Sequence, residues 1–149
     1  MSDESFEPLL IAFCCQYCSY SAADLAGSMR LQYPPNVRIV RTPCTGRLEV
    51  EFFLKAFERG ADGILVAGCL EGGCHFTEGN LLAKSRVSYT RKLLSESGLE
   101  EERIRMINIS AAQARPFVDC VNEMLATLKN LGPSPLRDMN PSKDTEMRI

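Results

Sequence analysis

The chain has 149 residues, a length typical of one domain that buries a core without disulfides. Hydrophobic residues make up 45% and charged residues 24%, at a net charge of -2, which excludes a wholly disordered chain and gives no electrostatic argument for nucleic-acid binding. The chain shows neither a signal-peptide pattern nor an apolar run of about 18 residues. We therefore expect a cytoplasmic protein that binds neither nucleic acid nor a membrane.

The two ends of the chain differ in composition from its middle. Residues 1–7 carry three acids and no apolar periodicity, and residues 132–149 contain three prolines and few apolar side chains. Such segments bury too little apolar surface to offset the entropy lost on ordering. We predict that residues 8–131 form one domain and that both ends are flexible.

Short apolar runs alternate with longer amphipathic runs along this domain. The predicted strands are residues 9–13, 37–40, 63–67 and 104–109, and the predicted helices are residues 21–33, 48–59, 80–97 and 112–131. Gly60, Gly98 and Gly132 follow the last three helices as expected caps. The alternation predicts an α/β fold, a small doubly wound layer of the flavodoxin or Rossmann kind, with about four parallel strands and helices on both faces.

The chain contains seven cysteines and a single histidine. This composition points to metal or redox chemistry in a reducing compartment. Six of the cysteines end or follow a predicted strand: Cys14, Cys15 and Cys18 the first, Cys44 the second, and Cys69 and Cys74 the third. Because the carboxyl ends of parallel strands meet at one edge of a sheet, we expect a shared site there. Cys120 lies among apolar residues of the last helix, where we expect plain core packing.

Three kinds of site compete with simple packing for these thiols. An iron–sulfur cluster takes four thiolates, and ligands from separate loops suit it, so it is favoured. Structural zinc also takes four cysteines, but usually as two close pairs. Thiol–disulfide exchange by Cys15 and Cys18 is third, because it leaves Cys44, Cys69 and Cys74 unexplained. A single histidine excludes a two-histidine Rieske centre, so we expect His75 to lie beside the ligands or in solvent.

Other chemistry has little support in the sequence. The glycines between residues 68 and 73 form neither a dinucleotide fingerprint nor a phosphate-binding loop. The arginines Arg30, Arg38, Arg41 and Arg47 form a possible basic edge near the cysteines, which would suit an acidic partner protein, although a solvated surface is the simpler interpretation.

Several motifs occur in a characteristic order along the chain. They are Cys15-Gln16-Tyr17-Cys18, Asp24-Leu25-Ala26-Gly27, Cys44-Thr45-Gly46-Arg47, Gly60-Ala61-Asp62-Gly63, and Gly68-Cys69 followed by Cys74-His75. In this combination the chain resembles the delta-subunit family of methyl-viologen-reducing hydrogenase over most of residues 9–131. It departs from the family pattern at Gln16-Tyr17, where Asn-Trp is expected, and in the loop between Cys69 and Cys74.

The resemblance implies a non-catalytic iron–sulfur subunit with a 2Fe-2S cluster. Such a subunit passes electrons between a hydrogenase or formate dehydrogenase and the flavoprotein subunit of a heterodisulfide-reductase complex, and its partners carry out the catalysis. The family positions are Cys15, Cys18, Cys44, Cys69 and Cys74, so five cysteines are candidates for four ligand places. We favour Cys15 and Cys18 with two of the other three, and Cys14 is additional.

Overall fold

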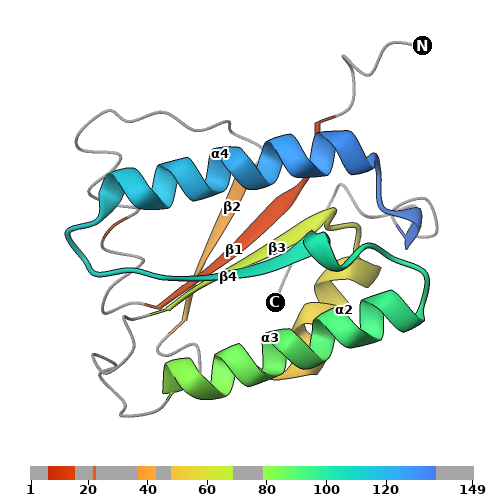
Figure 1. The fold of residues 1–149 in the computed structure, drawn as a ribbon, viewed down its shortest axis with the longest axis horizontal. Coiled ribbons are helices and arrows are strands. Elements are labelled where there is room, and N and C mark those ends of the chain that lie inside the picture. Colours follow the sequence, from red (N-terminus) through yellow and green to blue (C-terminus); the bar gives the residue numbers. More distant parts are fainter. Residues whose placement is uncertain (1–6, 16–21, 23–36, 43–47, 69–78, 137–149) are drawn as a thin grey trace.

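The centre of the protein is a parallel sheet of four strands. The computed structural model describes residues 7–15, 22, 37–42, 48–68 and 79–136, with no side chains described for 79–81. The strands are β1 (Leu10–Cys15), β2 (Val37–Thr42), β3 (Gly63–Gly68) and β4 (Ile104–Asn108), in the spatial order β2-β1-β3-β4. All three strand pairings are parallel, which confirms the predicted sheet (Figure 1).

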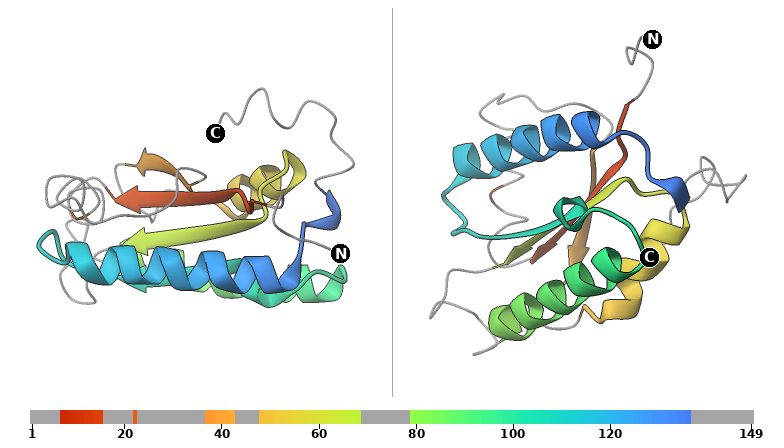
Figure 2. Two further views of the ribbon diagram at one scale, coloured as in Figure 1. Left: turned by 90° about the horizontal axis from the view of Figure 1, so that it is seen from above. Right: turned by 45° about the vertical axis from the view of Figure 1, so that its right-hand side comes forward.

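The strands end almost level with one another. Cys15 of β1 pairs with Thr42 of β2, and Cys14 pairs with Ala67 of β3. Gly68, the last residue of β3, pairs with Asn108, the last residue of β4. The carboxyl ends therefore form one edge of the sheet, and the arrowheads of β1 and β3 point the same way in the left panel of Figure 2.

In the part of the chain that the structure describes, three helices of more than one turn cover the two faces of the sheet. They are α2 (Val50–Glu58), α3 (Gly79–Glu96) and α4 (Ala114–Leu131), and a short 3-10 turn, η2 (Glu101–Arg103), precedes β4. These bounds lie within two residues of three of the predicted helices. The predicted helix 21–33 lies outside the described residues except for Ala22, which is helical and buried.

The glycines expected after three of the helices adopt the left-handed backbone conformation typical of helix ends. Gly60, Gly98 and Gly132 adopt φ values of 109°, 89° and 85°, the left-handed region in which glycine is favoured. Pro116 falls in the first turn of α4, where its missing N–H removes no helical hydrogen bond. The prediction that glycine ends each of these three helices is confirmed.

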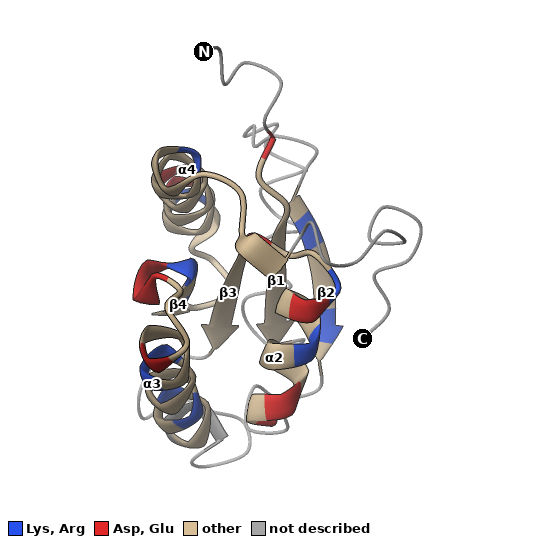
Figure 3. Ribbon diagram, turned by 90° about the vertical axis from the view of Figure 1, so that its right-hand side faces the viewer, with Lys and Arg blue, Asp and Glu red and all other residues tan. Residues whose placement is uncertain are grey.

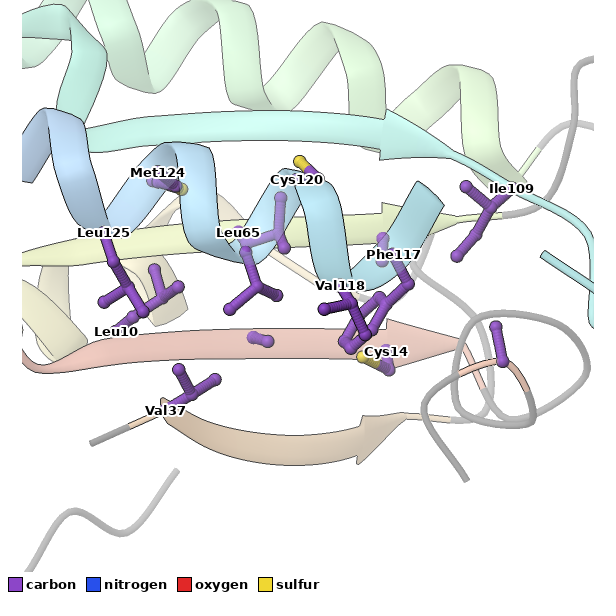
Figure 4. Packing of buried hydrophobic residues seen from close by; sticks show 14 of the residues in the cluster. Leu10, Cys14, Val37, Leu65, Ile109, Phe117, Val118, Cys120, Met124 and Leu125 are labelled. Carbon is purple, nitrogen blue, oxygen red and sulfur yellow. The ribbon is translucent and has the colours of Figure 1, made fainter. Parts of the chain in front are cut away.

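The sheet separates two hydrophobic clusters, as alternation along β1 requires. Leu10, Ala12 and Cys14 point to the face covered by α4, where they pack with residues such as Phe117 (Figure 4). Ile11 and Phe13 point to the other face, with residues of α2 and α3. There the rings of Phe13 and Phe53 meet edge to face, with centroids 5.9 Å apart. Helices on both faces confirm the doubly wound arrangement.

A polar network closes the amino-terminal edge of the sheet. Asp62, fully buried just before β3, accepts the Leu9 N–H at Oδ2 (2.8 Å) and the Ser134 N–H at Oδ1 (2.9 Å). Arg103 donates from Nη1 to the Asp62 carbonyl and from Nη2 to the Gly132 carbonyl, both at 3.0 Å. Residues 132–136 are thus tied to this edge, while residues 1–6 and 137–149 lie outside the described residues, so flexible ends remain a prediction there.

Among the residues that the structure describes, none of the helices combines the length and apolar character needed to cross a membrane.

Candidate metal centre

Cys15 is the one predicted ligand that the structure places. It is the last residue of β1, a central strand of the sheet, and its side chain is 1% exposed. The other predicted ligands, Cys18, Cys44, Cys69 and Cys74, lie outside the described residues, as does His75. Their assignment as ligands therefore remains a prediction.

The strand ends around Cys15 lead directly to two of these cysteines. β1 lies between β2 and β3, and Cys15 is paired with Thr42, the last residue of β2 and two positions before Cys44. On the other side, β3 ends at Gly68, the residue before Cys69. The described strand ends thus agree with the expectation that these segments leave the sheet at one edge.

Cys14 and Cys15 are adjacent in β1 and face opposite sides of the sheet. Successive side chains of a strand alternate between its faces. Cys14 is fully buried in the cluster under α4, whereas Cys15 belongs to neither hydrophobic cluster formed by the described residues. This separation is consistent with the prediction that Cys14 is additional to the ligand set.

Cys120 is a core residue, as predicted. It lies in α4, 3% exposed, among residues that include Phe117, Val121 and Met124 (Figure 4). Burial raises the pKa of the Cys120 thiol, against a smaller lowering by the charge of Arg105. The neutral thiol is thereby favoured, which suits packing and disfavours a role as nucleophile or metal ligand.

Thr42 is a residue of this edge that sequence reasoning missed. It is 7% exposed and is the backbone partner of Cys15 on the same face of the sheet. A buried hydroxyl so placed is the kind of group that can donate to a thiolate and alter its basicity. Its signal in the sequence was weak, because the predicted strand stopped at residue 40, where the apolar run ends.

Two grooves on the described surface lie away from this edge. One, of about 510 Å³, is lined by α3 and η2, and includes Arg91, Lys92 and Glu101. The other, of about 240 Å³, lies between β4 and α4 and includes Arg105 and Met124. Neither contains a cysteine, and no group of three histidine, cysteine or acidic side chains within the described ranges could hold a metal ion. A four-thiolate centre would therefore need cysteines from outside those ranges.

The predicted basic edge is placed only in part. Arg38 and Arg41 are exposed on β2, where Figure 3 shows basic residues along the strand. Arg30 and Arg47 lie outside the described residues.

The comparison with known proteins agrees with the family resemblance found in the sequence. Residues 10–132 match the family described as methyl-viologen-reducing hydrogenase, delta subunit. The chain is 50% identical over 131 residues to the vhu iron-sulfur subunit of the F420-non-reducing hydrogenase of Methanocaldococcus jannaschii, covering 88% of this chain and 98% of that protein. It is 46% identical over 130 residues to the iron-sulfur subunit of the F420-non-reducing hydrogenase of Archaeoglobus profundus, covering 87% and 95%.

A further relative is much longer. It is one of the subunits of the ferredoxin/F(420)H(2)-dependent CoB-CoM heterodisulfide reductase of Methanosarcina acetivorans, and it is 44% identical to this chain over 126 residues. The match covers 85% of this chain and 16% of that protein. In this relative, which is called the long reductase subunit below, a segment similar to this chain forms part of a larger polypeptide.

Proposed function

Because this chain belongs to the family of the methyl-viologen-reducing hydrogenase delta subunit, we propose that it is an iron–sulfur electron-transfer subunit. It would relay electrons between a hydrogenase or formate dehydrogenase and the flavoprotein subunit of a heterodisulfide-reductase complex. Catalysis would belong to those partners, and the cytoplasm, which keeps thiols reduced, would be its compartment.

The position of Cys15 is the observation that carries the proposal. A buried thiol ends β1, flanked by strand ends that lead to Cys44 and Cys69. The donor chemistry fits a 2Fe-2S cluster, because thiolates are its usual ligands and Cys15, Cys18, Cys44, Cys69 and Cys74 offer five for four places. When bound, such a cluster accepts and releases one electron.

The residues of the chain would hold the cluster and set its reduction potential. Thiolates bind the iron, and hydrogen bonds to sulfur favour the reduced form by stabilising negative charge. The Thr42 hydroxyl, buried at the position paired with Cys15, is a described candidate for one such bond.

The partners are supported by the relatives. Those similar over their whole length are named iron-sulfur subunits of a hydrogenase. Two others are heterodisulfide reductase subunits in which the similar segment is part of a longer polypeptide. Two domains that share one polypeptide commonly lie close to each other. We therefore propose that this chain binds the counterpart of the long reductase subunit, which would be its flavoprotein partner. A hydrogenase would be the donor, with formate dehydrogenase as the alternative donor.

The test is a metal and sulfide analysis of protein purified without oxygen, with electron paramagnetic resonance spectra before and after dithionite. We expect about two irons and two sulfides per chain and a signal that appears on reduction, as a 2Fe-2S cluster requires. One zinc without sulfide would instead indicate a structural docking domain. Thiol turnover that persists after metal removal would indicate a dithiol oxidoreductase.

Substitution of the neighbouring cysteines sharpens this test. Cys15→Ala removes a proposed ligand, so we expect loss of most of the iron and of the reduced-state signal. Cys14→Ala, at an equally buried position of the same strand, is the matched control and should keep the cluster while lowering stability by about 1 kcal/mol. Equal iron content in the two variants would refute the assignment of Cys15.

A further inference from the structure

Three described elements adjoin the segments that carry candidate ligands. β1 ends at Cys15, α2 begins after Cys44, and α3 begins after Cys74. Side chains alternate along β1, so Cys15 lies on the same face of the sheet as Phe13, and α2 and α3 cover that face (Figure 1). The relative positions of β1, α2 and α3 therefore determine where the ligand-bearing segments join the described core.

An aromatic contact fixes α2 against β1. The rings of Phe13 and Phe53 meet edge to face, with centroids 5.9 Å apart, and both side chains are fully buried. Phe13 lies two positions before Cys15 in the same strand. Because a close-packed core resists displacement of its side chains, this contact holds α2 in a fixed relation to the strand that carries Cys15.

Arg86 of α3 forms a second contact, between α3 and the residues that precede α2. Its Nη1 donates a hydrogen bond to the Leu48 carbonyl oxygen at 3.1 Å, and its Nη2 lies 3.7 Å from Glu49 Oε1. Leu48 is buried and is the first described residue after Cys44. A charged donor makes a stronger hydrogen bond than a neutral one, so Arg86 fixes the point at which the chain that carries Cys44 rejoins the core.

The hydrogen bond to Leu48 is the more important of these two contacts of Arg86. The side chains of Arg86 and Glu49 are 25% and 57% exposed, and an ion pair in such a position contributes little. The Leu48 carbonyl, in contrast, belongs to the backbone of a buried residue. Arg86 itself belongs to neither hydrophobic cluster of the described residues, so its replacement leaves the apolar core in place.

We propose that Arg86 is a positioning residue of the metal centre. By holding the chain before α2 against α3, it would fix the ends of the segments that carry Cys44, Cys69 and Cys74 relative to each other, on the face of the sheet that carries Cys15. Ligands held in place before binding lose less conformational entropy, and small displacements of ligands weaken a metal site. This inference rests on the proposed function, which supplies the cluster.

The experiment follows the full-length, cluster-loaded protein without oxygen, at a temperature well below its melting temperature. In Arg86→Gln, iron loss to an excess of the chelator EDTA should be about tenfold faster than in the wild type, because loss of a group that orients metal ligands has effects of that size. The electron paramagnetic resonance spectrum of the reduced cluster should also shift or broaden, since it responds to the arrangement of the ligands.

Two control variants separate this role from a general effect of charge. Arg91→Gln makes the same substitution in the same helix, where the arginine lies 4.0 Å from Glu101 of η2. Glu49→Gln removes the ion pair of Arg86 but keeps its hydrogen bond to the Leu48 carbonyl. Both should lose iron within about twofold of the wild-type rate and keep the wild-type spectrum.

The outcomes separate the positioning role from the proposed function. A wild-type protein without iron and sulfide would overturn the proposed function and this inference with it. If the wild type carries the cluster and Arg86→Gln matches Arg91→Gln in rate and spectrum, the inference alone is overturned. If Arg86→Gln loses iron only because part of the protein unfolds, the remaining cluster will give the wild-type spectrum, and that result would also overturn the positioning role.

Discussion

Arg103 is a charged side chain that the fold buries almost completely. It is 1% exposed, and all three guanidinium nitrogens donate hydrogen bonds: Nε to Glu100 Oε1 at 2.7 Å, and Nη1 and Nη2 to the carbonyls of Asp62 and Gly132. A buried guanidinium requires such partners, because an uncompensated charge in the interior costs several kcal/mol. Arg103 therefore links η2, the start of β3 and the end of α4.

Glu100 gives this link a pH dependence. The hydrogen bond from Arg103 holds the pKa of the Glu100 carboxyl below its usual value of 4.5, although burial acts in the opposite direction. A lowered folded-state pKa adds stability that is present above the unfolded value and is lost as the pH falls through the folded value. We expect Glu100→Gln to lower the free energy of unfolding at about pH 7 by about 1 kcal/mol or less, because the side chain is 41% exposed.

Urea unfolding at about pH 7 and at about pH 3 measures this effect. The difference in free energy of unfolding between Glu100→Gln and the wild type should be smaller at the lower pH, because the stability that comes from the lowered Glu100 pKa is lost as the pH falls. Glu102→Gln, at an exposed position two residues along the chain, is the control. A difference in free energy of unfolding between Glu100→Gln and the wild type that is the same at both pH values would contradict a lowered Glu100 pKa.

Helix α4 approaches β3 more closely than a side chain at residue 63 would allow. A Cβ at Gly63 would lie 2.5 Å from Leu128 Cδ1, and Leu128 is fully buried. Because Leu128 cannot swing into solvent, we expect Gly63→Ala to overpack this contact and lower the free energy of unfolding by about 1–3 kcal/mol.

A double-mutant cycle tests the cause of that loss. Leu128→Ala alone should cost about 2–5 kcal/mol through the cavity that it leaves. If the two residues clash as the structure indicates, Gly63→Ala should cost less in the Leu128→Ala background than in the wild type. Additive costs would show that Gly63→Ala acts through the backbone instead.

The elements show which parts of the structure the sequence can predict. Periodicity located the four strands and three of the helices, because apolar side chains must face the sheet at every second or every third and fourth position. It placed the end of β2 at residue 40, whereas pairing with β1 extends the strand through Arg41 to Thr42. The strand ends around Cys15 were predictable for the same reason. The other candidate ligands, Cys18, Cys44, Cys69 and Cys74, lie outside the described residues, so their arrangement stays a prediction.

The polar network at the amino edge was not predictable from local pattern. Its contacts join residues far apart in the chain: Leu9 with Asp62, separated by 53 positions, and Asp62 with Ser134, separated by 72. No local pattern in the sequence sets Glu100 apart from an ordinary solvated turn residue. Only the folded arrangement of β1, β3 and α4 reveals that these groups satisfy one another in the interior.

The whole molecule has two unlike edges. The carboxyl edge carries Cys15 and the strand ends that lead to the other candidate ligands, so the proposed electron-transfer partner would have to reach it. The amino edge is closed by Asp62 and Arg103, which hold the chain after α4 through Ser134 and Gly132. Placing the stabilising network at the edge opposite the site leaves the carboxyl edge available for ligands and partners.

Truncation of the chain tests whether residues 132–136 stabilise the fold through the network at the amino edge. Removal of residues 137–149 leaves the network intact, so the melting temperature should stay within about 2 °C of the full-length value. Removal of residues 132–149 takes away the Gly132 carbonyl and the Ser134 N–H, which leaves Arg103 and Asp62 with buried groups unsatisfied. At about 1–3 kcal/mol for each such group, and about 2–4 °C per kcal/mol, we expect the melting temperature to fall by about 5 °C or more. The iron content per folded chain should be the same in both truncated proteins, because all the cysteines precede residue 132. Equal melting temperatures of the two truncated proteins would refute a stabilising role for residues 132–136.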